Sequence, residues 1–276
     1  MKKHQLIWAV ALILTTTASG APGDEKSAVA ALEKMQDDVG TNLTITRDEH
    51  QPGKPVIKVI IIGDVTNAGL KELTALKQLQ SLTIHTCRNV DVGLKGLDTL
   101  MQLQSLEIQG GEATEVVLKE LSGLTGLRTL DLGYMEVTDA WLKKLAGLKK
   151  LQTLGLDSTK VTGTGLKELV GLKSLQKLNL SGTRVPETGL KELAQLTQLQ
   201  SLDLSYTMLV DAGLKELAAL KQLQSLRLRS TKVTDAGLKE LAALKQLKEL
   251  DLGQTAVTEP GVALLQKDLP ACKIHR

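Results

Sequence analysis

The residue types that most often carry catalysis or hold a metal are scarce in this sequence of 276 residues. A metal site usually draws several ligands from closely spaced histidines, cysteines or carboxylates. No histidine here has a second histidine at such a spacing, the four being His4, His50, His85 and His275. We therefore expect no enzyme, no cofactor and no metal centre.

Asp131 and Asp157 form the one carboxylate pair that suggests a chemistry. The repeat described below places them on neighbouring strands, and paired carboxylates can exchange protons or bind calcium. Against catalysis, aspartate is common in the Leu-Asp-Leu pattern of such repeats, and a bare sheet offers no cleft. We predict no catalysis and leave calcium dependence open, since a change in melting temperature at millimolar calcium would reveal it.

The whole chain is organised by a repeated unit, of which Leu223–Gln246 is one copy. Its first leucine recurs every 24 residues without a gap. A fixed period in this range indicates a stacked-repeat architecture, in which each unit contacts only its neighbours. The regular copies begin at Leu79, Leu103, Leu127, Leu151, Leu175, Leu199, Leu223 and Leu247.

Two periodicities meet within each unit. Leu226 and Leu228 are two residues apart and share one face of a strand. Leu238, Leu241 and Leu244 follow at a spacing of three, which predicts a short helix capped by the preceding Thr or Asp. Strands stack about 4.8 Å apart and helices about 8–10 Å apart, so the stack must curve with its sheet inside. The sequence predicts a curved α/β solenoid.

The pattern LxxLxLxxT…L resembles the leucine-rich-repeat family over about residues 55–275. The helical half, VTDAGLKEL, resembles a short-repeat subclass of exported bacterial proteins. The resemblance implies a horseshoe with a parallel sheet on its concave face and short helices on its convex face. It also implies that the ninth residue of each unit bonds to the neighbouring loop, which here would be the task of Thr159, Thr183, Thr207, Thr231 and Thr255.

The N-terminus has the features of a signal peptide, residues 1–20. Lys2 and Lys3 precede the apolar run Leu6–Leu14, and Ala18-Ser19-Gly20 is a candidate cleavage site. Nine apolar residues are too few to span a bilayer, which takes roughly 20, so we expect no stable membrane span after cleavage, although an uncleaved anchor is an alternative. Export to the periplasm, cell envelope or medium follows.

The remaining chain divides into a cap, an array and a second cap. Residues 21–54 are predicted to form a helix and a strand, with Ala28, Leu32 and Met35 on one helix face and Ser27 as the N-cap. Residues 55–268 contain one irregular and eight regular units, and residues 269–276 close the far end as a strand. Cys87 and Cys272 lie far apart in this arrangement, so we expect two free, mostly buried thiols rather than a disulfide.

Charge and aromatic content exclude nucleic acid as the partner. Removing Lys2 and Lys3 with the signal lowers the formal net charge from +3 to +1, which is too small for broad phosphate binding. The chain has no Phe and only two Trp and two Tyr, whereas base-stacking surfaces need several exposed rings.

The concave face holds the variation between the units. The helical segments Asp211–Leu223 and Asp235–Leu247 are identical, whereas the third, fifth and seventh residues of the strands differ from unit to unit. Binding or neutral drift would both produce this pattern. We predict a footprint for a protein partner, with tyrosines and arginines as anchors, at Asp131, Tyr134, Asp157, Asp203, Tyr206, Arg227 and Arg229.

The sequence therefore predicts a monomeric, exported, non-enzymatic protein-binding scaffold. A structural or adhesive envelope protein is the main alternative, which self-association without a ligand would favour. An F-box-type adaptor of a ubiquitin ligase, as in intracellular leucine-rich-repeat proteins, is less consistent with the export signal and with the short segment before the units.

Overall fold

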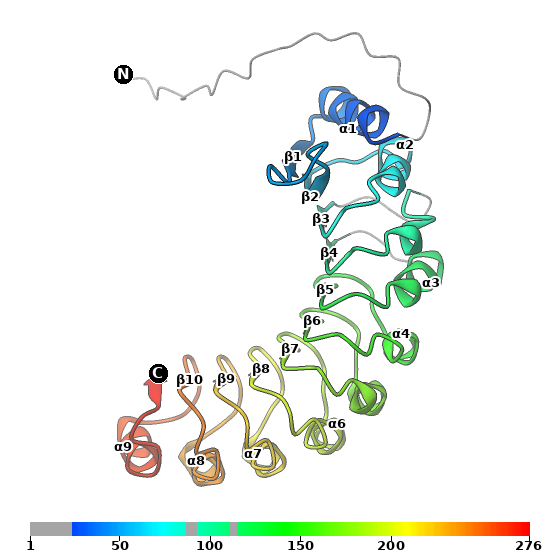
Figure 1. The fold of residues 1–276 in the computed structure, drawn as a ribbon. Coiled ribbons are helices and arrows are strands. Elements are labelled where there is room, and N and C mark those ends of the chain that lie inside the picture. Colours follow the sequence, from blue (N-terminus) through cyan, green and yellow to red (C-terminus); the bar gives the residue numbers. More distant parts are fainter. Residues whose placement is uncertain (1–23, 87–92, 111–114) are drawn as a thin grey trace, which may run out of the picture.

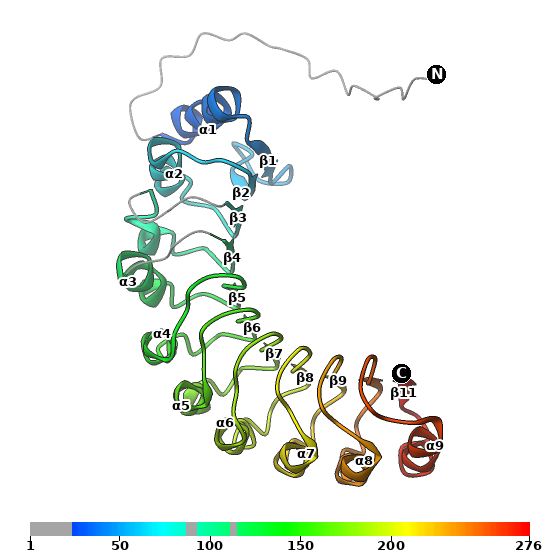
Figure 2. The same cartoon turned by 180° about the vertical axis from the view of Figure 1, so that it is seen from behind.

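The computed structural model describes residues 24–86, 93–110 and 115–276. These residues form an open arc, with the strands along its inner side and the helices along its outer side (Figures 1 and 2). A single sheet of eleven strands runs through the arc in sequence order, β1 to β11. All neighbouring strands are parallel except β1 and β2. The predicted curved α/β solenoid is confirmed.

Each unit contributes one strand, and most contribute one short helix. The strands are β1 (Asn42–Arg47), β2 (Val56–Ile62), β3 (Ser81–His85), β4 (Ser105–Gln109), β5 (Thr129–Asp131), β6 (Thr153–Gly155), β7 (Lys177–Asn179), β8 (Ser201–Asp203), β9 (Ser225–Arg227), β10 (Glu249–Asp251) and β11 (Lys273–His275). The α-helices are α1 (Glu25–Val39), α2 (Asn67–Glu72), α3 (Glu115–Gly123), α4 (Asp139–Leu145), α5 (Gly163–Leu166), α6 (Glu187–Leu193), α7 (Asp211–Leu217), α8 (Asp235–Leu241) and α9 (Glu259–Asp268). Three 3-10 helices, η1 (Leu73–Ala75), η2 (Leu97–Thr99) and η3 (Lys167–Gly171), complete the outer side. No helix among these residues is long and apolar enough to cross a membrane.

The core is a continuous layer of leucines between the sheet and the helices. From the strand side, Leu226 and Leu228 point into this core. From the helix side, Leu238, Leu241 and Leu244 cover them, and all five residues are buried. The helix is shorter than predicted, because α8 ends at Leu241 and Leu244 lies in the following turn. Apolar spacing thus identified the buried residues correctly but overestimated the length of the helix.

The N-terminal end of the array is covered by α1 and β1. Ala28, Leu32 and Met35 of α1 are buried, as predicted. The N-cap is Asp24, whose side chain accepts a hydrogen bond from the amide of Ser27 at 2.7 Å, so the assignment of Ser27 as the cap was wrong. Strand β1 pairs antiparallel with β2 and shields its edge.

At the other end, β11 adds a final parallel strand to β10. Leu269 and Cys272 are buried there, and burial raises the pKa of the Cys272 thiol. Cys87 and the predicted signal peptide lie outside the described residues. The boundaries of the predicted cap and signal segments remain predictions.

The threonine at the ninth position of the units has a different role from the one the resemblance implied. Its hydroxyl donates to the carbonyl three residues earlier in its own unit, at 2.5–2.7 Å, in all five copies. The expected bond to the neighbouring loop was therefore wrong. These hydroxyls close the turn after each strand, and in two copies the amide of the same threonine, Thr183 or Thr255, also donates to that carbonyl.

The contact between neighbouring loops is made instead by aspartates at the helix starts. Asp211 accepts bonds from the amide and hydroxyl of Thr234 in the next unit, at 2.8 and 2.6 Å. Asp235 does the same with Thr258, and these two donors lower the pKa of Asp235. We call this set of bonds the Asp–Thr ladder. These hydrogen bonds connect each of the two aspartates to the following unit on the outer side of the arc.

Candidate binding surface

The side chains on the inner side of the sheet form two rows that cross the strands. The pairing aligns the fifth residues of the units, from Glu107 on β4 through Asp131, Asp203 and Arg227. The seventh residues form a parallel row just beyond the strand ends, with Asp157 and Arg229 among them. We call this surface, made of the third, fifth and seventh residues of the units, the concave face.

Acidic groups gather on the part of the concave face near β4 to β6. Glu107 is paired with His85 at 2.7 Å. Asp131 leans across to β6, where it comes so close to Gly155 that a Cβ there would collide with its carboxylate. Asp157 leans the opposite way, and a Cβ at Gly133 would meet its carboxylate at 2.6 Å. Two glycines thus provide the space in which the carboxylates of neighbouring units approach each other.

The electrostatics of these aspartates reflect burial and mutual repulsion. The pKa of Asp131 is raised by desolvation and, to a lesser extent, by the charge of Glu107. The pKa of Asp157 is raised by desolvation and then by the charge of Asp131. The few compensating bonds include those from the Gly133 amide to Asp131, at 2.9 Å, and from the Asn179 amide group to Asp157, at 3.0 Å. No ion pair with a basic residue is formed by either aspartate among the described residues.

We expect Asp157→Asn to stabilise the protein at neutral pH. A carboxyl whose pKa rises on folding binds its proton more tightly in the folded state, so its ionisation above the raised pKa costs stability. Removing the charge should raise the free energy of unfolding at pH 7 by up to about 1 kcal/mol. The gain should disappear as the pH falls below the ordinary value of 3.8, where both states are protonated. Melting temperatures of wild type and variant between pH 3 and 7 would test this, and a difference independent of pH would contradict it.

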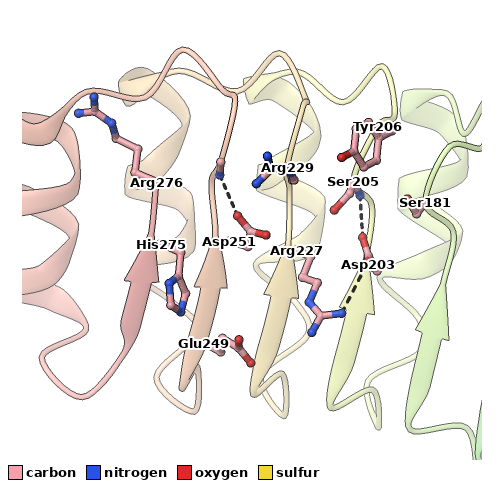
Figure 3. Close-up of a pocket in the computed structure, with 11 residues that line it drawn as sticks. Ser181, Asp203, Ser205, Tyr206, Arg227, Arg229, Glu249, Asp251, His275 and Arg276 are labelled. Atoms are coloured by element: carbon pink, nitrogen blue, oxygen red, sulfur yellow. Dashed lines mark hydrogen bonds and ion pairs between the residues drawn. The ribbon is translucent and has the colours of Figure 1, made fainter. Parts of the chain in front are cut away.

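The concave face is not a bare sheet, as the sequence suggested, but contains two hollows. The smaller has a volume of about 240 Å³ and lies over Gly155, between Asp131 and Asp203. The larger has a volume of about 520 Å³ and lies over β8 to β11 (Figure 3). Tyr206, Arg227 and Arg229 all line it.

The arginines of the larger hollow are only weakly neutralised. Arg227 approaches Asp203 at 3.9 Å, while its own side chain remains 55% exposed. Arg229 points toward Gly253, two residues beyond β10, where a Cβ would meet its guanidinium at 2.8 Å and the carboxylate of Asp251 at 3.1 Å. It forms no ion pair within the described part of the chain. Guanidinium groups in such a setting are ready to bind an anionic group.

Sequence reasoning missed the contribution of the chain end to this hollow. Glu249, His275 and Arg276 also line it. His275 is aligned with Asp251 by the pairing of β11 with β10 and so continues the row of fifth residues. The alternation of the last residues was interpreted only as a closing strand, although the same alternation placed His275 on the concave face.

Tyr134 and Tyr206 occupy the rim beside these charged groups. Both are exposed, at 64% and 59%, and both have left-handed backbones, with φ of 60° and 58°. The eighth residues of the other units from Leu103 onward, Gly110, Ser158, Gly182, Ser230 and Gln254, share this conformation, which costs an ordinary side chain about 1–2 kcal/mol. The left-handed backbone is thus a feature of the eighth position, and the two tyrosines are distinguished by large rings that remain exposed.

The structure brings the seven predicted residues into two groups. Tyr134, Asp131 and Asp157 lie near β5 and β6, and Asp203, Tyr206, Arg227 and Arg229 lie near β8 and β9. Among the described residues, no three His, Cys, Asp or Glu side chains are grouped so that they could hold a metal.

Comparisons with known proteins agree with this architecture. Residues 221–242 match the family model of the leucine-rich repeat. An internalin (inlF) of Listeria monocytogenes is structurally similar, with a TM-score of 0.59 and 22% identity over 75% of this chain. This chain spans only 56% of that protein. A search among curated proteins found no match.

Two further solved structures share the fold. Internalin C2 of the same species aligns with a TM-score of 0.55 and 23% identity, over 92% of both chains. The ectodomain of the plant receptor kinase GASSHO1/SCHENGEN3 from Arabidopsis thaliana aligns with a TM-score of 0.51 and 20% identity, over 77% of this chain and 28% of that one. The repeat and the fold together define the class: the structure is a leucine-rich-repeat solenoid.

Proposed function

We propose that the protein is an exported, non-enzymatic scaffold that binds a protein partner through its concave face. The observation that carries this proposal is the pair of exposed tyrosines on the rim, each next to charged groups with few or no ion-pair partners among the described residues. Tyrosine and arginine are also the residues that most often dominate binding energy at protein interfaces.

Related folds lend this proposal support. The plant ectodomain that shares the fold was solved in complex with CASPARIAN STRIP INTEGRITY FACTOR 2. Export is supported by the apolar run and small residues of segment 1–20 and is consistent with a bacterial envelope protein.

The test uses glycine to remove each tyrosine without harming the fold. Glycine relieves about 1–2 kcal/mol of left-handed strain and gives back roughly 0.5–1 kcal/mol as extra freedom of the unfolded chain. Over the two sites, the stability of Tyr134→Gly/Tyr206→Gly should therefore be unchanged or rise by up to about 3 kcal/mol, which urea denaturation would measure.

Binding should respond quite differently. The mature chain, residues 21–276, would be used to capture partners from the envelope fraction, alongside the double glycine variant. A control, Lys215→Ala/Lys239→Ala, changes the convex helices α7 and α8. We expect a specific partner to be retained by wild type and control and lost by the glycine variant, since each anchor typically contributes at least about 2 kcal/mol. Retention by all three would refute the concave-face proposal.

An adhesive role is the second candidate because one loop exposes several apolar side chains. Tyr206, Met208 and Val210 are 59%, 70% and 42% exposed in the segment between β8 and α7. Analytical ultracentrifugation of the purified chain would distinguish the candidates. A concentration-dependent oligomer abolished by Met208→Lys would favour adhesion, whereas a monomer at all concentrations would favour the scaffold.

A further inference from the structure

The two tyrosines belong to two equivalent stations of opposite charge. The amide of Tyr134 donates to the carbonyl of Asp157 in the next unit, at 2.9 Å, and the amide of Tyr206 donates to that of Arg229, at 2.7 Å. Tyr134 and Tyr206 are 72 residues apart, and so are Asp157 and Arg229. The same rim position thus presents a tyrosine beside an anion at one site and a tyrosine beside a cation three units later. We call them the acidic and the basic station.

Each station is reinforced by a second charge of the same sign. Asp131 leans toward the strand that leads into Asp157, and its charge contributes to the raised pKa of that residue. Arg227 stands two residues before Arg229 on β9, with its guanidinium exposed and 3.9 Å from Asp203. Neither Asp157 nor Arg229 has an ion-pair partner among the described residues.

Between the stations, the seventh residues have small and uncharged side chains, whereas the neighbouring rows carry Lys177 and Asp203. The row of seventh residues runs from Asp157 through Ser181 and Ser205 to Arg229, and the eighth position carries Ser158 and Gly182 where the stations carry tyrosine. A partner segment can lie along this row without meeting a large side chain. In Figure 3, Ser181 and Ser205 lie on the same side of the hollow as Tyr206.

The span between the charges follows from strand spacing. Three strand intervals of about 4.8 Å separate the two units, or roughly 14 Å. The carboxylate of Asp157 points toward Gly133 in the preceding unit, and the guanidinium of Arg229 points toward Gly253 in the following unit. The two charged groups can therefore be up to about five strand intervals, or 24 Å, apart. An extended chain covers roughly 3.3 Å per residue, which corresponds to about four to seven residues.

From this geometry we infer that the concave face binds an extended protein segment with a basic side chain at the acidic station and an acidic side chain at the basic station, about four to seven residues apart. The inference rests on the proposed function and adds the chemistry and spacing of the partner. Each opposite-charge contact attracts the matching segment, and each like-charge contact rejects a mismatched one.

Three blocked peptides of about seven residues would test this inference. All have a glycine-serine spacer, and their ends carry lysine and glutamate, two lysines, or two glutamates. Binding would be followed by NMR of glycine-labelled protein, because Gly133 reports on the acidic station and Gly253 on the basic one. At low salt we expect the lysine–glutamate peptide to bind about three- to tenfold more tightly than the other two. The preference should fade at about 0.5 M salt, where charges are screened within a few ångströms.

Charge reversal should switch the preference in a defined way. Asp157→Arg replaces one anion of the acidic station by a cation and should shift the preference toward the two-glutamate peptide, while Arg229→Asp should shift it toward the two-lysine peptide. Glu240→Arg on the convex helix α8 is the matched control and should leave the wild-type order unchanged. Melting curves would verify that all variants fold. Equal binding of the three peptides, absence of binding at low salt, or variants that keep the wild-type preference would overturn the inference.

These outcomes are separable from those of the capture experiment. If the glycine variant loses its partner but the peptides show no charge preference, the inference fails and the proposed function stands. If the peptides switch as expected but the glycine variant keeps every partner, the charged stations are supported and the tyrosine-anchored function is refuted.

Discussion

Replacing Leu202 by alanine is expected to lower the free energy of unfolding by about 2–5 kcal/mol. Leu202 is the residue of β8 whose side chain points into the leucine core, and it is only 1% exposed. It is flanked in the sheet by Leu178 and Leu226, the equivalent leucines of the neighbouring units. The substitution would leave a cavity that rigid neighbours on both sides cannot close.

The matched control is Leu264→Ala. Leu264 lies on α9 and is 62% exposed, so its truncation should change stability by no more than about 0.5 kcal/mol. Urea denaturation followed by circular dichroism would measure both variants. A loss below about 1 kcal/mol for Leu202→Ala would show that the array tolerates voids in its core.

The same substitution would also test how cooperative the array is. Each unit contacts only its neighbours, so a weak central unit can uncouple the two ends. Trp141 is buried in α4 and reports on its own unit by fluorescence, while circular dichroism reports on the whole chain. We expect the two transitions to coincide in wild type and to separate in Leu202→Ala. The apparent free energy of unfolding of this variant should also fall less steeply with urea concentration.

The period of the leucines was sufficient to predict the architecture because the core of this fold has a single repeating composition. The direction of curvature followed from the different widths of strands and helices. What could not be predicted was the shape of the concave face. The hollows depend on which way Asp131, Asp157 and Arg229 lean, and those directions are set by the glycines across from them.

The left-handed rim was also missed, although the sequence contained a sign of it. Gly110 and Gly182 align with Tyr134 and Tyr206, and glycine at a position of variable residues suggests a backbone that other residues rarely adopt. A comparison of the units reveals the residue type at each position but not the backbone conformation there. In the structure the left-handed backbone is common to this position, since Ser158, Ser230 and Gln254 adopt it as well as the two tyrosines.

The Asp–Thr ladder was interpreted from sequence only as helix capping. Its signal is a correlation between neighbouring units. Asp211 is followed 23 residues later by Thr234, whereas Glu187 is followed by Val210. Asp139 and Asp235 are likewise followed 23 residues later by Thr162 and Thr258. A comparison within single units could not reveal a bond that joins two of them.

The second large effect is therefore expected for Asp211→Ala. The substitution removes two hydrogen bonds, from the amide and hydroxyl of Thr234, to a charged acceptor. It also removes a negative charge from the first turn of α7, where the helix dipole favours it. Because the site is only partly buried, we expect a loss of about 1–3 kcal/mol and a stronger tendency of the array to divide between these two units.

The sequence supplies a control for this prediction at Glu187, which occupies the same place in α6 but faces Val210. Glu187→Ala loses the same dipole interaction without a ladder bond and should cost no more than about 1 kcal/mol. The hydroxyl contribution can be isolated by a double-mutant cycle with Thr234→Val, because coupling is expected only if the two side chains interact directly. Additive losses in the cycle, or equal losses for Asp211→Ala and Glu187→Ala, would show that the outer side of the arc is held by leucine packing alone. A coupling energy of at least about 0.5 kcal/mol would instead show that Asp211 and Thr234 join their two units directly.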